Sequence, residues 1–112
     1  MRSRQISCCF TGHRPEKLPW RYREADLRCL SLKRRIADAA EAAYEEGYRH
    51  FLCGMALGCD LYFCEAVLAL RDQYPDITVE AAVPCPTQAD AWALDQRERY
   101  TRLVEACDFE TL

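Results

Sequence analysis

Three short apolar runs alternate with longer amphipathic stretches; the runs cover residues 6–10, 48–53 and 77–83. Between the runs, apolar side chains recur at spacings of three and four residues, which is typical of a helix that buries one face. Strands and helices in this alternating order favour a parallel sheet with right-handed crossovers and helices on both faces. The pattern therefore predicts an α/β fold.

Turn and capping signals set the limits of the predicted helices. The first helix is expected to begin at Asp26 and to end at Gly47, and the second to end before Pro75. Residues 87–90 match a capping box, in which two side chains bond N–H groups at a helix start, so a third helix is expected from there to about residue 107. Residues 108–112 begin a fourth strand, which gives the order βαβαβα and then β.

The chain of 112 residues is expected to form a single domain over residues 1–112. Half of its residues are hydrophobic and 29% are charged, which is ordinary for a globular protein. The formal net charge of −3 speaks against broad electrostatic binding of nucleic acid. No apolar run approaches the roughly 20 residues that span a bilayer, and the chain starts without a signal-peptide pattern, so no membrane contact is predicted.

Eight cysteines are present, and most of them fall inside the predicted strands and helices rather than in loops. A reduced thiol in such a position behaves as a small hydrophobic side chain. There is no Cys-x-x-Cys pair and no histidine at zinc-finger spacing, so no metal site is expected, and no cofactor is expected either. Buried, reduced cysteines favour a cytoplasmic protein.

A glycine-containing segment, residues 53–60, joins the second predicted strand to the second helix. Gly54 and Gly58 could bring backbone N–H groups close to a phosphate at the helix start, and Asp60 could contact a ribose hydroxyl or a base. The alternative is that the glycines only allow a tight turn and that Asp60 caps the helix. Neither the dinucleotide fingerprint G-x-G-x-x-G nor the Lys-Ser/Thr pair of a P-loop is present.

The first apolar run is followed by Thr11, Gly12, His13 and Arg14. Arg14 could clamp a phosphate or carboxylate with two N–H groups, His13 could donate or move a proton, and Thr11 could supply a hydroxyl donor. The alternative is a surface turn with a solvated arginine. Because the carboxyl ends of parallel strands lie at one edge of a sheet, this loop and the segment 53–60 are expected to form one ligand site.

Other side chains also have both a functional and a structural interpretation. Trp20 could cover a bound base or hold its loop on the body of the protein. Glu65 could act as a base in the same pocket or lie on the helix surface. Cys59 could be a nucleophile, although no sequence feature identifies a base that would activate it. Trp92 is expected mainly to pack, and the basic run at residues 33–35 to form a solvated helix face.

Residues 53–60, with the sequence CGMALGCD, resemble the S-G-x-A-x-G-x-D motif of the SLOG superfamily. That superfamily groups the DNA-uptake protein DprA with the LOG-type nucleotide hydrolases. Residues 11–15, residues 74–76 and the loop at Pro84 are more similar to the YpsA-like branch, a bacterial family of unknown function. The resemblance covers essentially the whole chain, and Cys53 stands where the superfamily usually has serine.

The resemblance implies a Rossmann-like fold of three layers and a nucleotide or nucleotide-derived ligand. The ligand contacts that it implies are Thr11, Gly12, Arg14, Gly54, Ala56, Gly58 and Asp60, and His13 joins them by its place in the first loop. The Gly-Gly-x-Gly-Thr segment of the LOG-type hydrolases is absent, so no catalytic residue is assigned. Family members continue with at least one more strand and helix, so the domain is expected to be incomplete at its C-terminus.

Three functions are compatible with these features. The first is a module that binds a nucleotide without catalysis, because two loops are suited to phosphate. The second is an enzyme that hydrolyses the N-glycosidic or phosphoribosyl bond of a nucleotide, with Asp60 or Glu65 as acid or base. The third is a DprA-like binder of single-stranded nucleic acid, against which the acidic balance speaks. An exposed edge strand could also pair with another copy of the chain.

Overall fold

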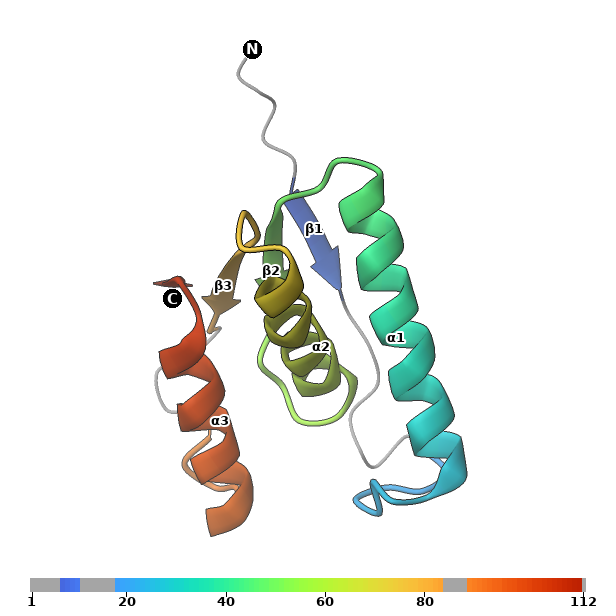
Figure 1. Ribbon diagram of the computed structural model, residues 1–112. Coiled ribbons are helices and arrows are strands. Elements are labelled where there is room, and N and C mark those ends of the chain that lie inside the picture. Colours follow the sequence, from blue (N-terminus) through green and yellow to red (C-terminus); the bar gives the residue numbers. More distant parts are fainter. Residues whose placement is uncertain (1–6, 11–17, 84–88, 112) are drawn as a thin grey trace.

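Strands and helices alternate along the chain in the computed structural model, which describes residues 7–10, 18–83 and 89–111 (Figure 1). The strands are β1 (Ser7–Phe10), β2 (His50–Cys53), β3 (Thr78–Ala82) and β4 (Phe109–Thr111). The helices are α1 (Leu27–Glu45), α2 (Cys59–Gln73) and α3 (Leu94–Ala106). The predicted order of elements and the parallel α/β fold are confirmed.

The limits of α1 and α2 follow from the local sequence. Asp26 is the N-cap of α1, and its Oδ1 accepts a hydrogen bond from the backbone N–H of Arg28 at 2.8 Å. Gly47 lies just beyond the end of α1 with a φ of 112°, a left-handed conformation that glycine adopts without strain. α2 has Tyr74 as its C-cap, and the following Pro75 cannot continue a helix. The sequence predicted these limits.

The start of α3 lies later than the sequence predicts. Its N-cap is Ala93, and the residues before it form a turn that is closed by a hydrogen bond from the N–H of Trp92 to the carbonyl oxygen of Ala89 at 3.1 Å. Residues 87 and 88 of the predicted capping box lie outside the described residues. The turn brings the Trp92 ring edge-on to Tyr100, with ring centroids 5.3 Å apart. The residues before Ala93 thus pack an aromatic side chain on α3 and do not extend the helix.

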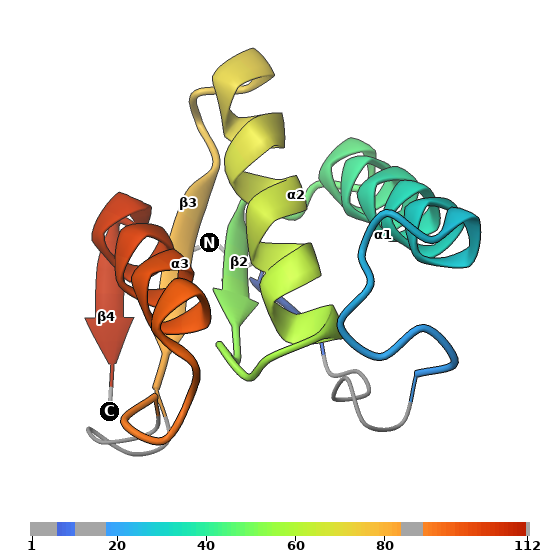
Figure 2. The same ribbon diagram turned by 90° about the horizontal axis from the view of Figure 1, so that it is seen from below.

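The four strands lie in the order β1-β2-β3-β4, and all neighbouring strands are parallel. Each crossover therefore steps in the same direction, and right-handed crossovers of this kind carry every helix over the same face of the sheet. Figure 2 shows the three helices in one layer, with α2 between α1 and α3 and in contact with both. Among the described residues no helix covers the second face, where a three-layer fold would have one.

The two faces of the central strands carry different side chains. On the face that the helices cover, Phe51 and Val79 are fully buried. On the second face, the ring of His50 lies between Thr78 and Glu80, with Nδ1 2.7 Å from Thr78 Oγ1 and Nε2 2.8 Å from Glu80 Oε1. The helix-covered face is thus apolar, whereas the second face holds a hydrogen-bonded polar cluster.

The hydrophobic core lies between the sheet and the helix layer, and no charged side chain of the described residues is buried in it. Five cysteines have described side chains, all five are free thiols, and all except the half-buried Cys107 are buried: Cys29, Cys53, Cys59, Cys64 and Cys107. The prediction of buried, reduced cysteines is confirmed for the first four of these and lies outside the described side chains for Cys8, Cys9 and Cys85. None of the described helices is long and apolar enough to cross a membrane.

Candidate functional site

The carboxyl ends of β1 and β2 lie side by side, because Phe10 is in register with Cys53. The chain leaves β2 at this edge of the sheet and enters α2 through the turn of residues 54–58, which is visible in both ribbon views (Figures 1 and 2). Gly54, Ala56, Gly58 and Asp60 thus lie together at the predicted edge. The other four predicted ligand contacts, Thr11, Gly12, His13 and Arg14, lie outside the described residues.

The turn between β2 and α2 has two residues in left-handed backbone conformations. Gly58, the N-cap of α2, has φ 88° and ψ −134°, a combination that is open essentially to glycine alone. Met55 has φ 66°, which is uncommon for a residue with a side chain, and that side chain is fully buried. Burial of Met55 holds the strained turn in place, and Gly58 brings the backbone to the helix start without any capping side chain.

Gly54 is favoured for a different reason, which is the nearness of the Asp60 carboxylate. A Cβ atom at position 54 would lie 2.8 Å from Asp60 Oδ2, closer than real Cβ contacts allow. Asp60 belongs to the first turn of α2, and its carboxylate folds back over the glycine, where it also interacts favourably with the positive end of the helix dipole. The alternative interpretation, in which Asp60 is the N-cap of the helix, is wrong, because Gly58 occupies that position.

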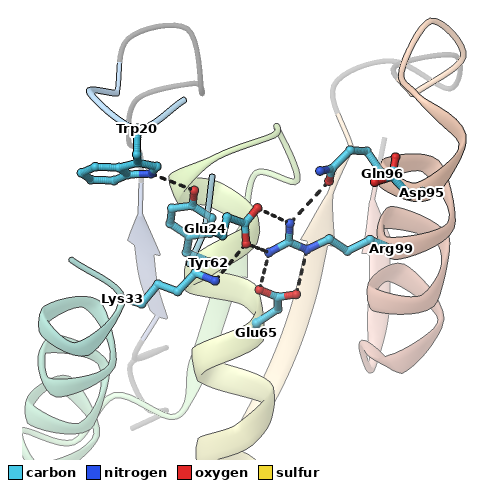
Figure 3. A network of polar contacts seen from close by, with 8 residues as sticks. All are labelled: Trp20, Glu24, Lys33, Tyr62, Glu65, Asp95, Gln96 and Arg99. Carbon is cyan, nitrogen blue, oxygen red and sulfur yellow. Dashed lines mark hydrogen bonds and ion pairs between the residues drawn. The ribbon is translucent and has the colours of Figure 1, made fainter. Parts of the chain in front are cut away.

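A network of charged side chains centred on Arg99 lies between α2, α3 and residues 18–26 (Figure 3). All five N–H donors of the Arg99 guanidinium are used. Nε and Nη2 donate to the two carboxylate oxygens of Glu65 at 2.9 and 2.7 Å. Nη1 and Nη2 donate to the two oxygens of Glu24 at 2.7 and 2.9 Å, and Nη1 also donates to Gln96 Oε1 at 3.4 Å. Two bidentate ion pairs therefore join α3 to α2 and to the segment before α1.

The segment of residues 18–26 is fastened to the helix layer at two more points. Lys33 on α1 donates to Glu24 Oε1 at 2.9 Å, and Trp20 Nε1 donates to the hydroxyl of Tyr62 on α2 at 3.4 Å (Figure 3). Trp20 is only 8% exposed, so it holds its loop on the body of the protein, as the structural interpretation predicts. Of the basic run at residues 33–35, Lys33 is half-buried in this network, whereas the other two side chains are exposed as predicted.

The network shifts the pKa values of Glu24 and Arg99. Burial alone would raise the pKa of Glu24, but hydrogen bonds from Arg99 and Lys33 outweigh it and lower the pKa below its ordinary value. Burial alone would lower the pKa of Arg99, but the hydrogen bonds that Arg99 donates to Glu65 and Glu24 raise it instead. Both shifts favour the charged forms of Glu24 and Arg99, which are the forms that pair with each other.

Glu65 was a candidate for a base in the ligand site, and the structure assigns it to the network instead. Both of its carboxylate oxygens accept hydrogen bonds from Arg99. Arg99 was not among the predicted site residues, although its position gives a signal. It lies one helical turn before Leu103, the buried residue of α3, and so falls on the inward stripe of that helix.

The remaining sequence candidates also have structural roles. Cys59 is 4% exposed, which gives its thiol little access for nucleophilic attack. Trp92 packs on Tyr100 as described above. Within the described ranges, no three His, Cys, Asp or Glu side chains are grouped so that they could hold a metal ion. The turn of residues 54–60 is therefore the part of the predicted site that the structure describes.

Comparison with known proteins agrees with this architecture. The family model for YpsA, described as the YspA SLOG family, matches residues 8–112. The UPF0398 protein YpsA of Bacillus subtilis is 28% identical over 101 residues, which cover 90% of this chain and 56% of the relative. A UPF0398 protein of Halalkalibacterium halodurans is 31% identical over 78 residues, 70% of this chain and 41% of the relative.

A further UPF0398 protein, from Bacillus licheniformis, is 27% identical over 99 residues, which cover 88% of this chain and 54% of the relative. The chain thus spans about half the length of the curated relatives that it matches. The family model, by contrast, covers nearly the whole of the chain. The chain therefore belongs to the YpsA SLOG family.

Proposed function

We propose that the chain binds a nucleotide or a nucleotide-derived anion at the carboxyl edge of its parallel sheet. The observation that carries this proposal is the turn of residues 54–60. Each of its two glycines has a structural reason: Gly58 has a positive φ, and a Cβ at Gly54 would press on the carboxylate of Asp60. A turn of this kind between a buried strand and a helix start is where α/β proteins hold phosphate groups.

The first wall of the proposed site is formed by Gly54, Ala56, Gly58 and the start of α2. Gly58 has no side chain to occupy the space in front of the helix, so a phosphate can approach the backbone there. Asp60 lies beside the same turn, where its carboxylate is suited to accept a hydrogen bond from a sugar hydroxyl or a base.

The loop that follows β1 is proposed as the second wall, and the register between the ends of β1 and β2 supports this. In this loop Arg14 supplies a bidentate phosphate clamp, and Thr11, Gly12 and His13 supply hydrogen-bond donors. The engagement of both oxygens of Glu65 by Arg99 favours binding over hydrolysis, since it removes one of the two carboxylates considered as acid or base.

Thermal unfolding in the presence of nucleoside mono-, di- and triphosphates tests the proposal. A ligand that binds only the folded state at a hundredfold excess over its Kd adds about 2.7 kcal/mol to the free energy of unfolding, which raises the melting temperature by several degrees. Arg14→Ala should lose most of this rise. The matched control is Arg34→Ala, an arginine on α1 whose side chain is 80% exposed, and it should keep the full rise.

The same titration should be run on the longer Bacillus subtilis relative, because this chain spans about half of it. The proposal is contradicted if no nucleotide shifts the melting temperature of either protein at millimolar concentration. Retention of single-stranded DNA that weakens steeply with salt, without a response to free nucleotides, would instead point to a nucleic-acid binder.

A further inference from the structure

We propose that Cys64 and Cys107 form an oxidative modification site, at which a small-molecule disulfide converts the two thiols into an intramolecular disulfide bond. Cys64 lies on α2 and Cys107 is the C-cap of α3, 43 positions further along the chain. Their Sγ atoms are 4.0 Å apart. A disulfide bond requires about 2 Å, so the two sulfur atoms must approach by only about half their present separation.

The position of Cys107 is fixed by contacts on both sides that involve no sulfur atom. Arg71, two helical turns after Cys64 on α2, donates to the carbonyl oxygen of Ala106 and to Asp108 Oδ2, each at 2.9 Å. Asp108 in turn exchanges two hydrogen bonds of 2.8 Å with the backbone of Val79 on β3. The two thiols therefore lie side by side because hydrogen bonds that involve no sulfur hold α2, the end of α3 and β3 together.

The two thiols differ in their access to a reagent. Cys64 is fully buried, whereas Cys107 is half-buried at the end of α3, where the backbone has already left the helical conformation with φ −72° and ψ 156°. Cys107 is thus the entry point for a reagent. The other cysteines with described side chains, Cys29, Cys53 and Cys59, are all buried.

The reaction takes two exchange steps with oxidised glutathione as the oxidant. The Cys107 thiolate attacks one sulfur of the glutathione disulfide, whose other half leaves as a thiolate and takes up the proton that Cys107 lost. Cys64, after losing its proton, then attacks the Cys107 sulfur of the mixed disulfide and expels the second glutathione. Overall, two cysteine thiols are oxidised to one disulfide and one glutathione disulfide is reduced to two glutathione thiols.

The surroundings make this exchange slow at neutral pH. The hydrogen bond with Cys64 and burial raise the pKa of the Cys107 thiol, and the nearby charges of Arg71 and Asp108 act in opposite directions. Because the thiolate is the attacking form, the rate should increase with pH. Once formed, the bond is shielded by the same burial and should resist reduction.

To test the proposal, the reduced chain is incubated with oxidised glutathione. It is then digested without a reducing agent, and its peptides are mapped by mass spectrometry. The expected product has lost the mass of two hydrogen atoms, contains a peptide pair joined through Cys64 and Cys107, and melts roughly 10 °C higher than the reduced chain. Cys107→Ser should abolish this pair, and Cys29→Ala, a matched change at another buried thiol, should leave it in place.

Three results would overturn the proposal. The first is a linkage of either cysteine to another cysteine of the chain, such as the buried Cys53. The second is a stable glutathione adduct on Cys107 that Cys64 does not resolve. The third is recovery of both thiols unmodified after prolonged oxidation at pH 8.5 or above. The mapping uses the wild-type chain, so its outcome stands even if a variant folds poorly.

Discussion

Two carboxylates on α2, only five residues apart, belong to regions of opposite character. Asp60 lies in the turn at the sheet edge, packed against the backbone of Gly54. Glu65 lies in the network, where both of its oxygens are held by Arg99. Both side chains are half-buried, and in the sequence both were equally plausible as an acid or base. The two carboxylates differ in their partners: Asp60 packs against a glycine, whereas Glu65 is bound by both sides of an arginine.

The difference shows how each region is built. The network is a side-chain structure, in which one guanidinium with five bonds fastens residues 18–26 and α3 to α2. The turn is a backbone structure, in which left-handed residues and a missing Cβ set the path of the chain. The first region should therefore govern stability, and the second should govern what can approach the sheet edge.

Arg99→Met should have the largest effect on stability, a loss of about 2 kcal/mol in the free energy of unfolding. The change leaves the carboxylates of Glu24 and Glu65 half-buried without their bidentate partner. Denaturant titration measures the loss. Arg97→Met, at an exposed arginine two residues earlier on α3, is the matched control and should change stability by less than 0.5 kcal/mol, as surface changes usually do. Equal effects of the two changes would mean that the network does not fasten the helices.

Gly54→Ala should have the next largest effect, about 1 kcal/mol, because the new Cβ forces the carboxylate of Asp60 away. A double-mutant cycle with Asp60→Ala isolates the cause. In the Asp60→Ala background the same glycine change should cost clearly less, since the atom that it meets is gone. An equal cost in both backgrounds would contradict the contact with Asp60 as the cause.

Glu24→Gln should have the smallest effect, and one that depends on pH. The folded state lowers the pKa of Glu24 below its ordinary value of 4.5, so its contribution to stability is present above pH 4.5 and is lost as the pH falls through the lower folded value. The difference in melting temperature between the wild type and Glu24→Gln should therefore narrow between pH 6 and pH 3. The control Glu98→Gln, at an exposed position on α3, should give a difference that does not vary in this way.

The order of helices and strands could be predicted because it depends on local patterns. Which face of the sheet the helices cover could not be predicted in this way. Apolar periodicity gave the strands and helices, whereas the order of strands, which places all described helices on one face, depends on which strands pair. A clue was present in the charged Glu80 inside the third apolar run. With His50, it marks the face that the helices do not cover.

The candidate site divides in the same way. The glycine turn was predicted because glycine adopts backbone conformations that other residues avoid. The contact of Gly54 with Asp60, by contrast, is not visible in any local pattern. The Arg99 network was not predicted, because its members are up to 75 positions apart in the chain. Glu24, Glu65 and Arg99 meet only when residues 18–26, α2 and α3 pack together.

The strand order also bears on how the chain can fold during its own synthesis. Each strand pairs with the strand that precedes it in the sequence, so no later segment has to be inserted between two earlier neighbours. The chain leaves the ribosome from its N-terminus, and every new strand therefore emerges when the edge that it pairs with has already been made. Every pairing closes over a single crossover, which limits the entropy lost in loop closure. The sheet can grow one strand at a time, in the order in which the ribosome makes it.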